Sequence, residues 1–546
     1  MKQVLNRRGT IVVEEVPEPQ CGRGQVKIAL THSLISAGTE LRSLELQGQG
    51  LATRARNRPD LVKKILERAR SQGVQAAYRA VREKLDEPKA LGYSATGIVR
   101  EVGFDVTGFG PGDRVSCGGA GAAHAEIVCV PENLVVHVPE NVVPEHAAFA
   151  TVGSIAMQGV RRANPQLGET FVVIGLGLVG QLVVQLCKAA GLHVLATDLA
   201  ADRVALAKQL GADDAWTPNE ADAVGRVMTH TEGLGADGVI IAAGSQSSEP
   251  VRLAMDVLRE RGRLSIVGVV GLDLPWDPFY VKELDVFMSR SYGPGRYDAD
   301  YEERGMKYPL SHVRWTETEN MAEVLRLIAD GRLNVAPLVS EVHPVGDAAR
   351  AYERLESAEP KPIGVLLSHN GRLREPVVVT NRPASRQPRR PAGVAVIGCG
   401  GFAKQERLPF LKTDAAFRIE MLVSRSGPKV KQLAAQYGTT KFDTDYRAAL
   451  ADPAVHLLVV ASPHSTHGPI AIDAANAGKD IVMEKPMAVN EDELEAVYAA
   501  VKLSGVRFSV GFNRRFAPGS ATLKRFVEST GGPVSTLRRA ALAVPA

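Results

Sequence analysis

Cysteine is scarce in this chain and never closely paired. The five cysteines among 546 residues are widely spaced, and none forms a C-x-x-C pair. This argues against a disulfide scaffold and favours reduced thiols. Long apolar runs are also missing: none reaches the roughly 18 residues of a membrane span, and the N-terminus has no apolar signal core. We therefore expect a cytoplasmic protein with no membrane partner.

A large excess of charge of one sign is missing as well. The net charge is +4, too small at this length to indicate nucleic acid as a partner. A chain this long exceeds a single core, and about three or four domains are expected. Residues 59–85 combine helical periodicity with an excess of basic residues. This segment predicts either a solvated amphipathic helix or a cap that offers positive charge to a phosphorylated or carboxylated substrate.

A glycine-rich turn organises the first part of the chain. Its parts are a strand at 171–174, the turn Gly175, Gly177, Val179 and Gly180, a helix at 181–190, a strand at 193–197, and Asp198. This order is typical of a dinucleotide site, although a glycine turn also occurs in ordinary α/β domains. Gly175 allows the tight turn, Gly177 lets the backbone approach a pyrophosphate, and Gly180 lets the helix pack against the strand. The helix N-terminus supplies free N–H groups.

The rest of the chain divides around two such turns. Short apolar runs separated by Gly and Pro predict a β-rich domain at 1–155, completed by about 300–370. Alternating strands and helices predict a parallel, doubly wound α/β sheet at 156–299. Residues 371–392 are rich in Arg and Pro and read as a linker. A second strand and glycine turn, 394–403, opens another sheet at 393–515, and 516–546 would begin a further domain.

Residues 1–370 resemble the medium-chain dehydrogenase/reductase family, the alcohol dehydrogenase type. The resemblance rests on the glycine turn and on three further stretches: Gly97–Gly103 with Gly112–Val115, Lys208–Asp213, and Arg350–Leu355. It implies a GroES-like catalytic domain around a Rossmann domain. Asp198 matches the family's ribose-binding acid and Arg203 its basic neighbour. A carboxylate there favours NAD(H) over NADP(H), unless Asp198 merely starts the next turn.

The family's zinc ligands are replaced in this sequence. Zinc-dependent members need a Cys in an early loop, a Gly-His-Glu segment and a third Cys or His. Here the corresponding positions read Ala37, Gly92-Tyr93-Ser94 and Ala150–Gly153, and the four-Cys lobe expected around Cys117 is missing. We expect neither zinc. His124 is a single imidazole and predicts a packed or surface histidine rather than a site.

Without zinc, a carbonyl oxygen still needs a hydrogen bond or a proton as hydride arrives. Thr39 resembles the family's proton-relay hydroxyl, and Tyr93 stands where a metal ligand would. Both are candidate catalytic residues, with a satisfied hydroxyl in the cleft as the alternative for each. Glu40 is expected to support the loop. The segment Tyr292–Tyr297 predicts a substrate lid or a plain turn.

Residues 393–546 resemble the glucose-fructose oxidoreductase/inositol dehydrogenase (Gfo/Idh/MocA) family. Three motifs carry this resemblance: the turn Gly398, Gly400 and Ala403; the loop 462–467; and Glu484-Lys485-Pro486. By position, Lys485 is the candidate catalytic residue, because an ammonium there stabilises developing negative charge on the substrate oxygen. Glu484 and His467 would line the cofactor. Ser424 and Arg425 follow the second strand where an acid would favour NAD(H), so this module is expected to take NAD(H) or NADP(H).

The second resemblance is incomplete in the sequence given. The family has a further α/β domain with an Asp and a His of the catalytic set, which residues 511–516 would enter, whereas the sequence ends at Ala546. We expect a truncated sequence, completion by another chain, or a half that only binds dinucleotide. An uncovered sheet edge would favour association, so we expect a homo-oligomer.

Together these features predict a zinc-independent NAD(P)-dependent oxidoreductase acting on a carbonyl or hydroxyl of a small molecule. The second resemblance suggests a sugar, as does the likeness to the bi-domain oxidoreductases of bacterial polysaccharide gene sets. That argument is one of association. The alternatives are a C=C reductase of the enone or quinone type and a dinucleotide-binding sensor or scaffold without catalysis.

Overall fold

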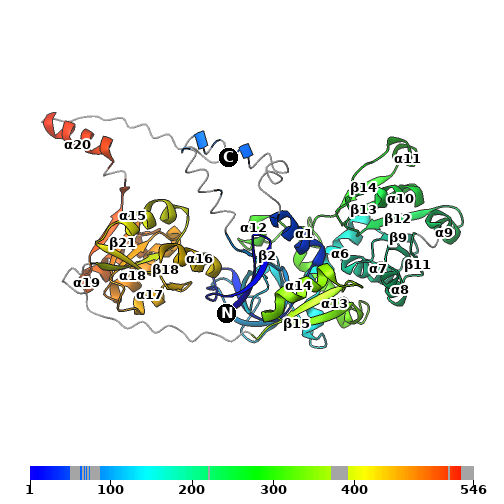
Figure 1. The fold of residues 1–546 in the computed structure, drawn as a ribbon, viewed down its shortest axis with the longest axis horizontal. Coiled ribbons are helices and arrows are strands. Elements are labelled where there is room, and N and C mark those ends of the chain that lie inside the picture. The colour runs from blue at the N-terminus through cyan, green and yellow to red at the C-terminus, as the bar shows by residue number, and fades with distance from the viewer. Residues whose placement is uncertain are drawn as a thin grey trace. The chain divides into compact units, whose positions relative to one another are not determined.

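The computed structural model describes residues 1–48, 87–218, 222–370, 391–513 and 517–530, with single positions between 62 and 81. The basic segment at 59–85 and the linker at 371–392 lie mostly outside the described residues. The chain divides into two compact units, Met1–Arg374 and Glu375–Ala546 (Figure 1). In the described part of the chain, no helix is long and apolar enough to cross a membrane.

The first unit contains a β-rich domain built from both of its ends. Its main sheet has the order β15-β16-β3-β5-β6-β8, with β7 also paired to β3, and a smaller sheet has the order β2-β1-β4. The strands are β1 (Lys2–Arg7), β2 (Thr10–Glu15), β3 (Gln25–Ile35), β4 (Lys89–Ala90), β5 (Ser94–Val102), β6 (Arg114–Gly118), β7 (Ile127–Pro131), β8 (Val135–His137), β15 (Val339–Pro344) and β16 (Gly364–Ser368). β16 runs antiparallel to β3, with Val365 opposite Ile35. The GroES-like domain implied by the resemblance is thereby confirmed.

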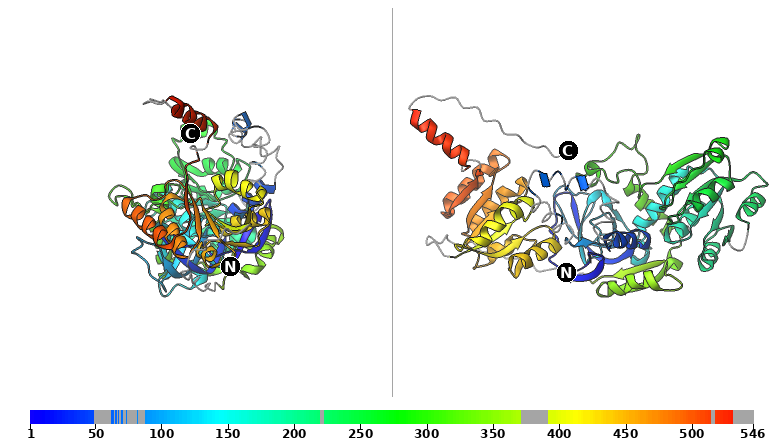
Figure 2. Two further views of the ribbon diagram at one scale, coloured as in Figure 1. Left: turned by 90° about the vertical axis from the view of Figure 1, so that its left-hand side faces the viewer. Right: turned by 45° about the horizontal axis from the view of Figure 1, so that its top comes forward.

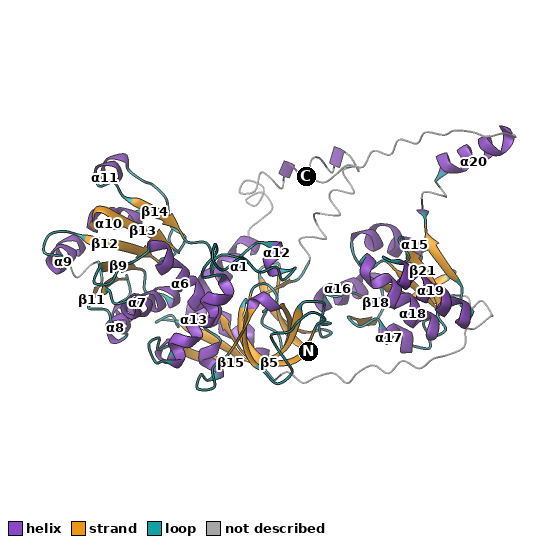
Figure 3. Cartoon of the chain, turned by 180° about the vertical axis from the view of Figure 1, so that it is seen from behind, coloured by secondary structure: helices purple, strands orange, loops and turns teal. Residues whose placement is uncertain are grey.

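A six-stranded parallel sheet forms the Rossmann domain of the first unit (Figure 3). Its order is β11-β10-β9-β12-β13-β14, from β9 (Thr170–Ile174), β10 (His193–Thr197), β11 (Asp214–Trp216), β12 (Ala236–Ile241), β13 (Leu258–Ile266) and β14 (Asp285–Met288). The helices are α6 (Ala150–Ala163), α7 (Leu178–Ala189), α8 (Ala201–Gln209), α9 (Ala223–His230), α10 (Glu249–Val257) and α11 (Trp276–Val281).

Alternation along β9 distributes these helices over two faces. Phe171 and Val173 pack into a cluster with α6, α7 and α8, whereas Val172 and Ile174 pack with α9 and α10. Because successive strand residues point to opposite faces, one continuous apolar run supports both layers. The carboxyl end of β9 is left free to run into the glycine turn.

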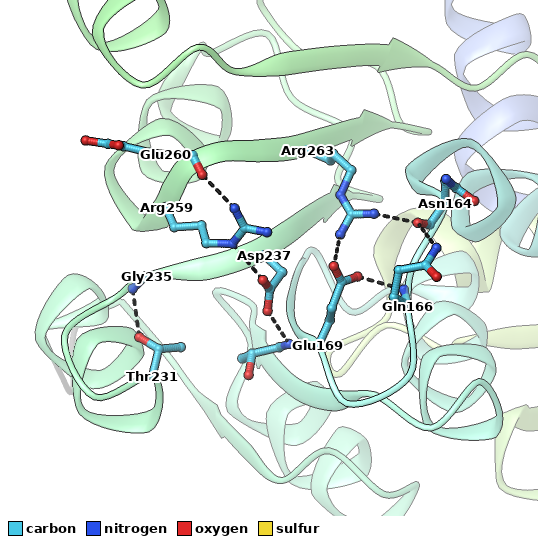
Figure 4. A network of polar contacts seen from close by, with 10 residues as sticks. Asn164, Gln166, Glu169, Thr231, Gly235, Asp237, Arg259, Glu260 and Arg263 are labelled. Atoms are coloured by element: carbon cyan, nitrogen blue, oxygen red, sulfur yellow. Dashed lines mark hydrogen bonds and ion pairs between the residues drawn. The ribbon is translucent and has the colours of Figure 1, made fainter.

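Ion pairs fix the opposite end of this sheet, where the strands begin (Figure 4). The Arg259 guanidinium donates to Asp237 at 2.7 Å, and Asp237 accepts from the backbone N–H of Thr170 at 2.8 Å. Arg263 pairs with Glu169 just before β9. These contacts join the starts of β9, β12 and β13, so the sheet is held at the end away from the glycine turn.

Helix α1 (Ala37–Gly48) and three further helices of the first unit lie outside the Rossmann sheet. The three are α12 (Ala299–Glu302), α13 (Glu317–Ala329) and α14 (Ala348–Ser357). α13 begins with a capping box, in which Thr316 and Glu319 satisfy each other's backbone N–H groups. Its apolar side packs against α6 and β8.

The second unit repeats the doubly wound plan (Figure 2). Its sheet has the order β19-β18-β17-β20-β21-β22, all parallel, from β17 (Ala392–Ile397), β18 (Phe417–Val423), β19 (Lys441–Asp443), β20 (Leu457–Val460), β21 (Asp480–Glu484) and β22 (Phe508–Gly511). The helices are α15 (Leu408–Thr413), α16 (Gly427–Tyr437), α17 (Arg447–Ala451), α18 (His467–Asn476), α19 (Glu491–Ser504) and α20 (Pro518–Thr530). Ala395 and Ile397 face α17, α18 and α19, while Val394 and Val396 face α15 and α16.

Candidate functional site

The first glycine turn has the geometry that a dinucleotide needs. Gly175 has φ +92°, and a Cβ there would lie 2.6 Å from the backbone nitrogen of Ala243. A Cβ on Gly180 would lie 1.8 Å from the carbonyl oxygen of Gly175. Around Gly177 the space is open, with the nearest atom, Nη1 of Arg203, 3.8 Å from the Cβ position. The turn is therefore tight where it packs and open where a pyrophosphate would approach.

The start of α7 presents backbone donors at this open space. Gly177 precedes the helix and supplies no side-chain cap, so the first N–H groups remain free for an anion. Val179 is half-buried and packs against the cluster shared with α6. It lies in the first turn of α7, which begins directly after the open position at Gly177.

Asp198 ties the end of β10 to the glycine turn. Its carboxylate accepts from the N–H of Leu176 at 2.6 Å and from the N–H of Ala200 at 2.9 Å. A carboxylate has about four acceptor positions, so lone pairs remain for ribose hydroxyls. Arg203 donates to the carbonyl of Lys361 at 3.2 Å beside the same turn. The structure thus brings the predicted acid and its basic neighbour to the first turn.

The two candidate hydroxyls, those of Thr39 and Tyr93, lie close together in the catalytic domain. Burial raises the pKa of the Tyr93 phenol, and hydrogen bonding with Ser36 and Thr39 opposes part of this rise. Tyr93 therefore stays protonated at neutral pH and can donate. Thr39 lies in the first turn of α1 and is exposed. The arrangement can offer hydrogen bonds to a substrate oxygen at this point.

A buried polar network supports this pair, and the sequence did not predict it. Glu40 accepts from the N–H of Ser36 at 2.9 Å and from the Tyr352 phenol. His124 contacts Glu40 through Nε2 at 3.2 Å and Ser33 through Nδ1 at 2.7 Å. Burial raises the pKa of Glu40, but these partners outweigh it and leave the pKa below its ordinary value.

The network reaches Tyr93 through its neighbour Gly92. Gly92 has φ +92°, and a Cβ there would lie 2.6 Å from Nδ1 of His124. His124 is fully buried, so it is a packed histidine rather than a surface one. The supporting role expected for Glu40 agrees with its bond to Ser36. Its partners come from distant parts of the chain, and no local spacing could have joined them.

The residues at the family's zinc positions do not fit a zinc ion. Ala37 has no donor atom, and a neutral phenol at Tyr93 is a poor substitute for an imidazole. The third position, on α6, has Thr151 bonded to the carbonyl of Cys117 at 3.2 Å. Within the described residues, no group of three or more His, Cys, Asp or Glu side chains is placed to hold a metal.

The second glycine turn repeats the pattern in the second unit. Gly398 has φ +88°, and a Cβ there would lie 2.4 Å from the backbone nitrogen of Ser462. Nothing lies within 4 Å of a Cβ on Gly400, while Ala403 is fully buried. Ser424 and the exposed Arg425 follow β18 at the same edge of the sheet. The open position again lies where a pyrophosphate would approach.

Glu484 ends β21 at this edge, and Lys485 and Pro486 follow it. Glu484 pairs with Arg407. His467 is fully buried and faces two carbonyl oxygens, that of Pro486 at 2.6 Å and that of Ser462 at 3.0 Å. Both ring nitrogens of His467 therefore face backbone carbonyls at this edge of the sheet. Lys485 is exposed, and its ammonium has no carboxylate within 4 Å in the described part of the chain.

Three family models match the chain. The alcohol dehydrogenase GroES-like domain matches residues 66–140, the zinc-binding dehydrogenase family residues 179–304, and the oxidoreductase family with an NAD-binding Rossmann fold (Gfo/Idh/MocA) residues 392–512. A probable zinc-binding alcohol dehydrogenase of Mycobacterium tuberculosis is 30% identical over 298 residues, 49% of this chain and 71% of the relative. The chain belongs to the alcohol dehydrogenase family, with a Gfo/Idh/MocA module fused behind it.

Other relatives agree with both parts. A sorbitol dehydrogenase of Halalkalibacterium halodurans is 25% identical over 393 residues, 66% of this chain and 96% of that enzyme. A levoglucosan dehydrogenase of Pseudarthrobacter phenanthrenivorans is 33% identical over 142 residues, 25% of this chain and only 36% of that enzyme. The alcohol dehydrogenase TADH of Thermus sp. ATN1 shares the fold, with a TM-score of 0.53 at 23% identity, covering 68% of this chain and all of the other. The fused chain is thus an NAD(P)-dependent oxidoreductase of CH–OH or C=O groups.

Proposed function

We propose that the first module is a zinc-independent, NAD-dependent oxidoreductase that moves hydride between NAD(H) and a carbonyl or hydroxyl of a sugar or sugar derivative. The observation that carries this proposal is the pairing of Tyr93, which stands where zinc-dependent relatives need a metal ligand, with Thr39, which resembles the family's proton-relay hydroxyl. Asp198 beside the open turn supports NAD(H) as the preferred cofactor.

The residues supply the parts of a hydride transfer that the cofactor does not. Bound NADH supplies the hydride to a carbonyl carbon. Tyr93 and Thr39 donate hydrogen bonds to the carbonyl oxygen, and a proton passes from this hydroxyl pair to the product alkoxide. Solvent reprotonates the pair through the exposed Thr39. The Glu40 network holds the loop so that both hydroxyls keep their positions.

Relatives of both modules support a sugar or polyol as the substrate. The names sorbitol dehydrogenase and levoglucosan dehydrogenase describe those two proteins, one similar to each module. For the second module we propose dinucleotide binding between Gly400 and Arg425, with Lys485 as the catalytic ammonium. Its exposed ammonium, which has no carboxylate within 4 Å in the described part of the chain, supports this role. A place in bacterial polysaccharide metabolism is part of the proposal.

A substrate panel tests the proposal directly. NADH oxidation by the full chain is measured with ketoses, keto-sugar acids and enones, before and after treatment with EDTA. Reduction of ketoses that survives EDTA, with substoichiometric zinc by elemental analysis, is the expected result. Turnover confined to enones would instead identify a C=C reductase, and tight NADH binding without turnover would identify a sensor or scaffold.

A further inference from the structure

The segment 289–297, which connects β14 to the loop before α12, has an unusual backbone. Ser291 has φ +56° and Tyr297 φ +67°, and Gly293 and Gly295 also have positive φ. Left-handed conformations are unfavourable for residues with a side chain and persist where the surroundings enforce them. The segment therefore holds its side chains in fixed positions.

Tyr292 anchors the segment in the catalytic domain, beside Tyr93. It is 2% exposed and packs in the cluster formed by β3, β5, β6 and β7. Its phenol oxygen lies 3.4 Å from the Cβ position of Gly119, whose N–H donates to the carbonyl of Tyr93 at 3.2 Å. At the other end of the segment, Tyr297 is close enough to Tyr93 to act on it electrostatically. Tyr292 thus lies against Gly119, which bonds the backbone of Tyr93, and Tyr297 lies within electrostatic range of the Tyr93 phenol.

At the exposed end of the segment, two guanidinium groups contact the ring of Tyr297. The Cζ atoms of Arg290 and Arg296 lie 4.2 Å and 4.0 Å from the centroid of the Tyr297 ring. Arg296 also pairs with Glu302, which offsets its charge. In the described part of the chain, Arg290 has no carboxylate within 4 Å and is exposed.

The buried side of the segment adds no negative charge to offset Arg290. Glu317 lies under it, with Oε1 3.1 Å from the Cβ position of Gly295. Its carboxyl is fully buried, neither oxygen has a hydrogen-bond partner, and burial raises its pKa to about 9. Glu317 is therefore neutral at physiological pH, and the cluster of Arg290, Arg296, Glu302 and Glu317 has one net positive charge.

We propose that Arg290, stacked on Tyr297, binds an oxyanion on the substrate, a carboxylate or a phosphate, while the reacting carbonyl meets Thr39 and Tyr93. A guanidinium is well suited to this role because its planar N–H groups pair with two oxyanion oxygens at once. Tyr297 holds the guanidinium in place and offers a ring face to the carbon skeleton. The inference rests on the proposed function and gives its substrate a class: anionic sugar derivatives.

Matched substrates separate the anion from the sugar. The full chain is assayed with NADH and D-fructose, D-fructose 6-phosphate or 5-keto-D-gluconate, which distinguish no anion, a phosphate and a carboxylate. Arg290→Ala is expected to lower kcat/KM for one or both anionic ketoses by about 10- to 100-fold, mainly through KM, and to leave D-fructose unchanged. Arg290→Lys should restore part of the loss. Arg100→Ala, which removes an exposed guanidinium on β5, is the control.

A binding measurement keeps this test independent of the proposed function. Calorimetric titration of the NADH-saturated protein with the same compounds reports binding even if none is turned over. The inference is supported if the wild-type protein binds an anionic ketose more tightly than D-fructose, and if Arg290→Ala abolishes this preference while Arg100→Ala does not. Equal losses for all three ketoses, or no preference for an anion in the wild-type protein, would overturn it. Absence of turnover with intact anion binding would count against the proposed function alone.

Discussion

At the scale of single residues, the phenol of Tyr93 is expected to contribute directly to catalysis. Because burial keeps it protonated and Thr39 lies within hydrogen-bonding reach, it is the better placed donor to a substrate oxygen. Tyr93→Phe should lower kcat for ketose reduction by about 10- to 100-fold with little change in KM. Steady-state NADH oxidation measures this effect.

A control separates catalysis from packing. Tyr280 is an exposed phenol on α11, and Tyr280→Phe should leave kcat unchanged. Thr39→Val in a Tyr93→Phe background should add little, because both hydroxyls serve the same oxygen and their losses do not sum. Full activity of Tyr93→Phe would remove the hydroxyl pair from the mechanism.

The buried carboxyl of Glu317 is expected to make the stability of the protein depend on pH. Its pKa is about 9 in the folded chain and near the ordinary 4.5 when unfolded. Its contribution to stability is therefore fully present below pH 4.5 and is lost as pH rises toward 9. Glu317→Gln should flatten the fall in unfolding free energy between pH 6 and pH 8.5, a fall of about 1.4 kcal/mol per pH unit for one proton.

Urea denaturation at the two pH values measures this slope. Besides burial, two ionisable groups act on the pKa of Glu317: Glu302 raises it and Arg296 lowers it. The neighbouring phenols of Tyr292 and Tyr301 stay neutral in this range. Glu303→Gln, at an exposed position directly after α12, should keep the wild-type slope. A slope that Glu317→Gln leaves unchanged would mean that this carboxyl ionises normally.

The sequence predicted residues that stand in short motifs and missed those joined across the chain. The glycine turns and Asp198 follow from local spacing, because the turn itself is the binding feature. The bonds of Glu40 to His124 and Tyr352 join three segments separated by more than 80 and 300 positions. Such contacts depend on the tertiary packing of β3 and α14, which no local pattern encodes.

At the scale of elements, the turn between β9 and α7 contains one glycine that the fold requires and one that cofactor binding requires. Gly180→Ala places a Cβ 1.8 Å from a backbone oxygen and should lower the free energy of unfolding by about 1–3 kcal/mol. Gly177→Ala meets nothing closer than 3.8 Å and should leave stability within about 0.5 kcal/mol, while it weakens NADH binding. Thermal unfolding and fluorescence titration separate the two; equal destabilisation would refute this account of the turn.

Strand positions were predictable from apolar runs, and strand ends less so. The apolar residues at 264–269 are typical of a strand, but β13 spans Leu258–Ile266, and charged residues dominate its first half. Those residues include Arg259 and Arg263, which pair with Asp237 and Glu169 across the sheet. Their charges interrupt the apolar pattern, because ion pairs across the sheet hold that end together with the buried Leu258. The pairing of β16 with β3 followed only from the family resemblance.

At the scale of the whole molecule, the chain has two dinucleotide turns in two separate units. Each unit has its own parallel sheet with its own clusters on both faces. In both, a central glycine has open space around its Cβ position: Gly177 in the first and Gly400 in the second. A larger side chain at either point should occupy the pyrophosphate position without disturbing the fold.

The two sites should therefore behave as independent sites on one chain. Wild-type protein should bind about two dinucleotides per chain when NADH and NADPH are titrated in turn, Gly177→Val and Gly400→Val about one each, and the double variant none. Because neither substitution touches the other unit's core, the dissociation constant of the remaining site should stay within about twofold. Calorimetry measures both numbers, and circular dichroism confirms that each variant is folded. Loss of both sites from a single substitution would show that the modules are energetically coupled, and retention of two sites in Gly400→Val would remove the second turn from dinucleotide binding.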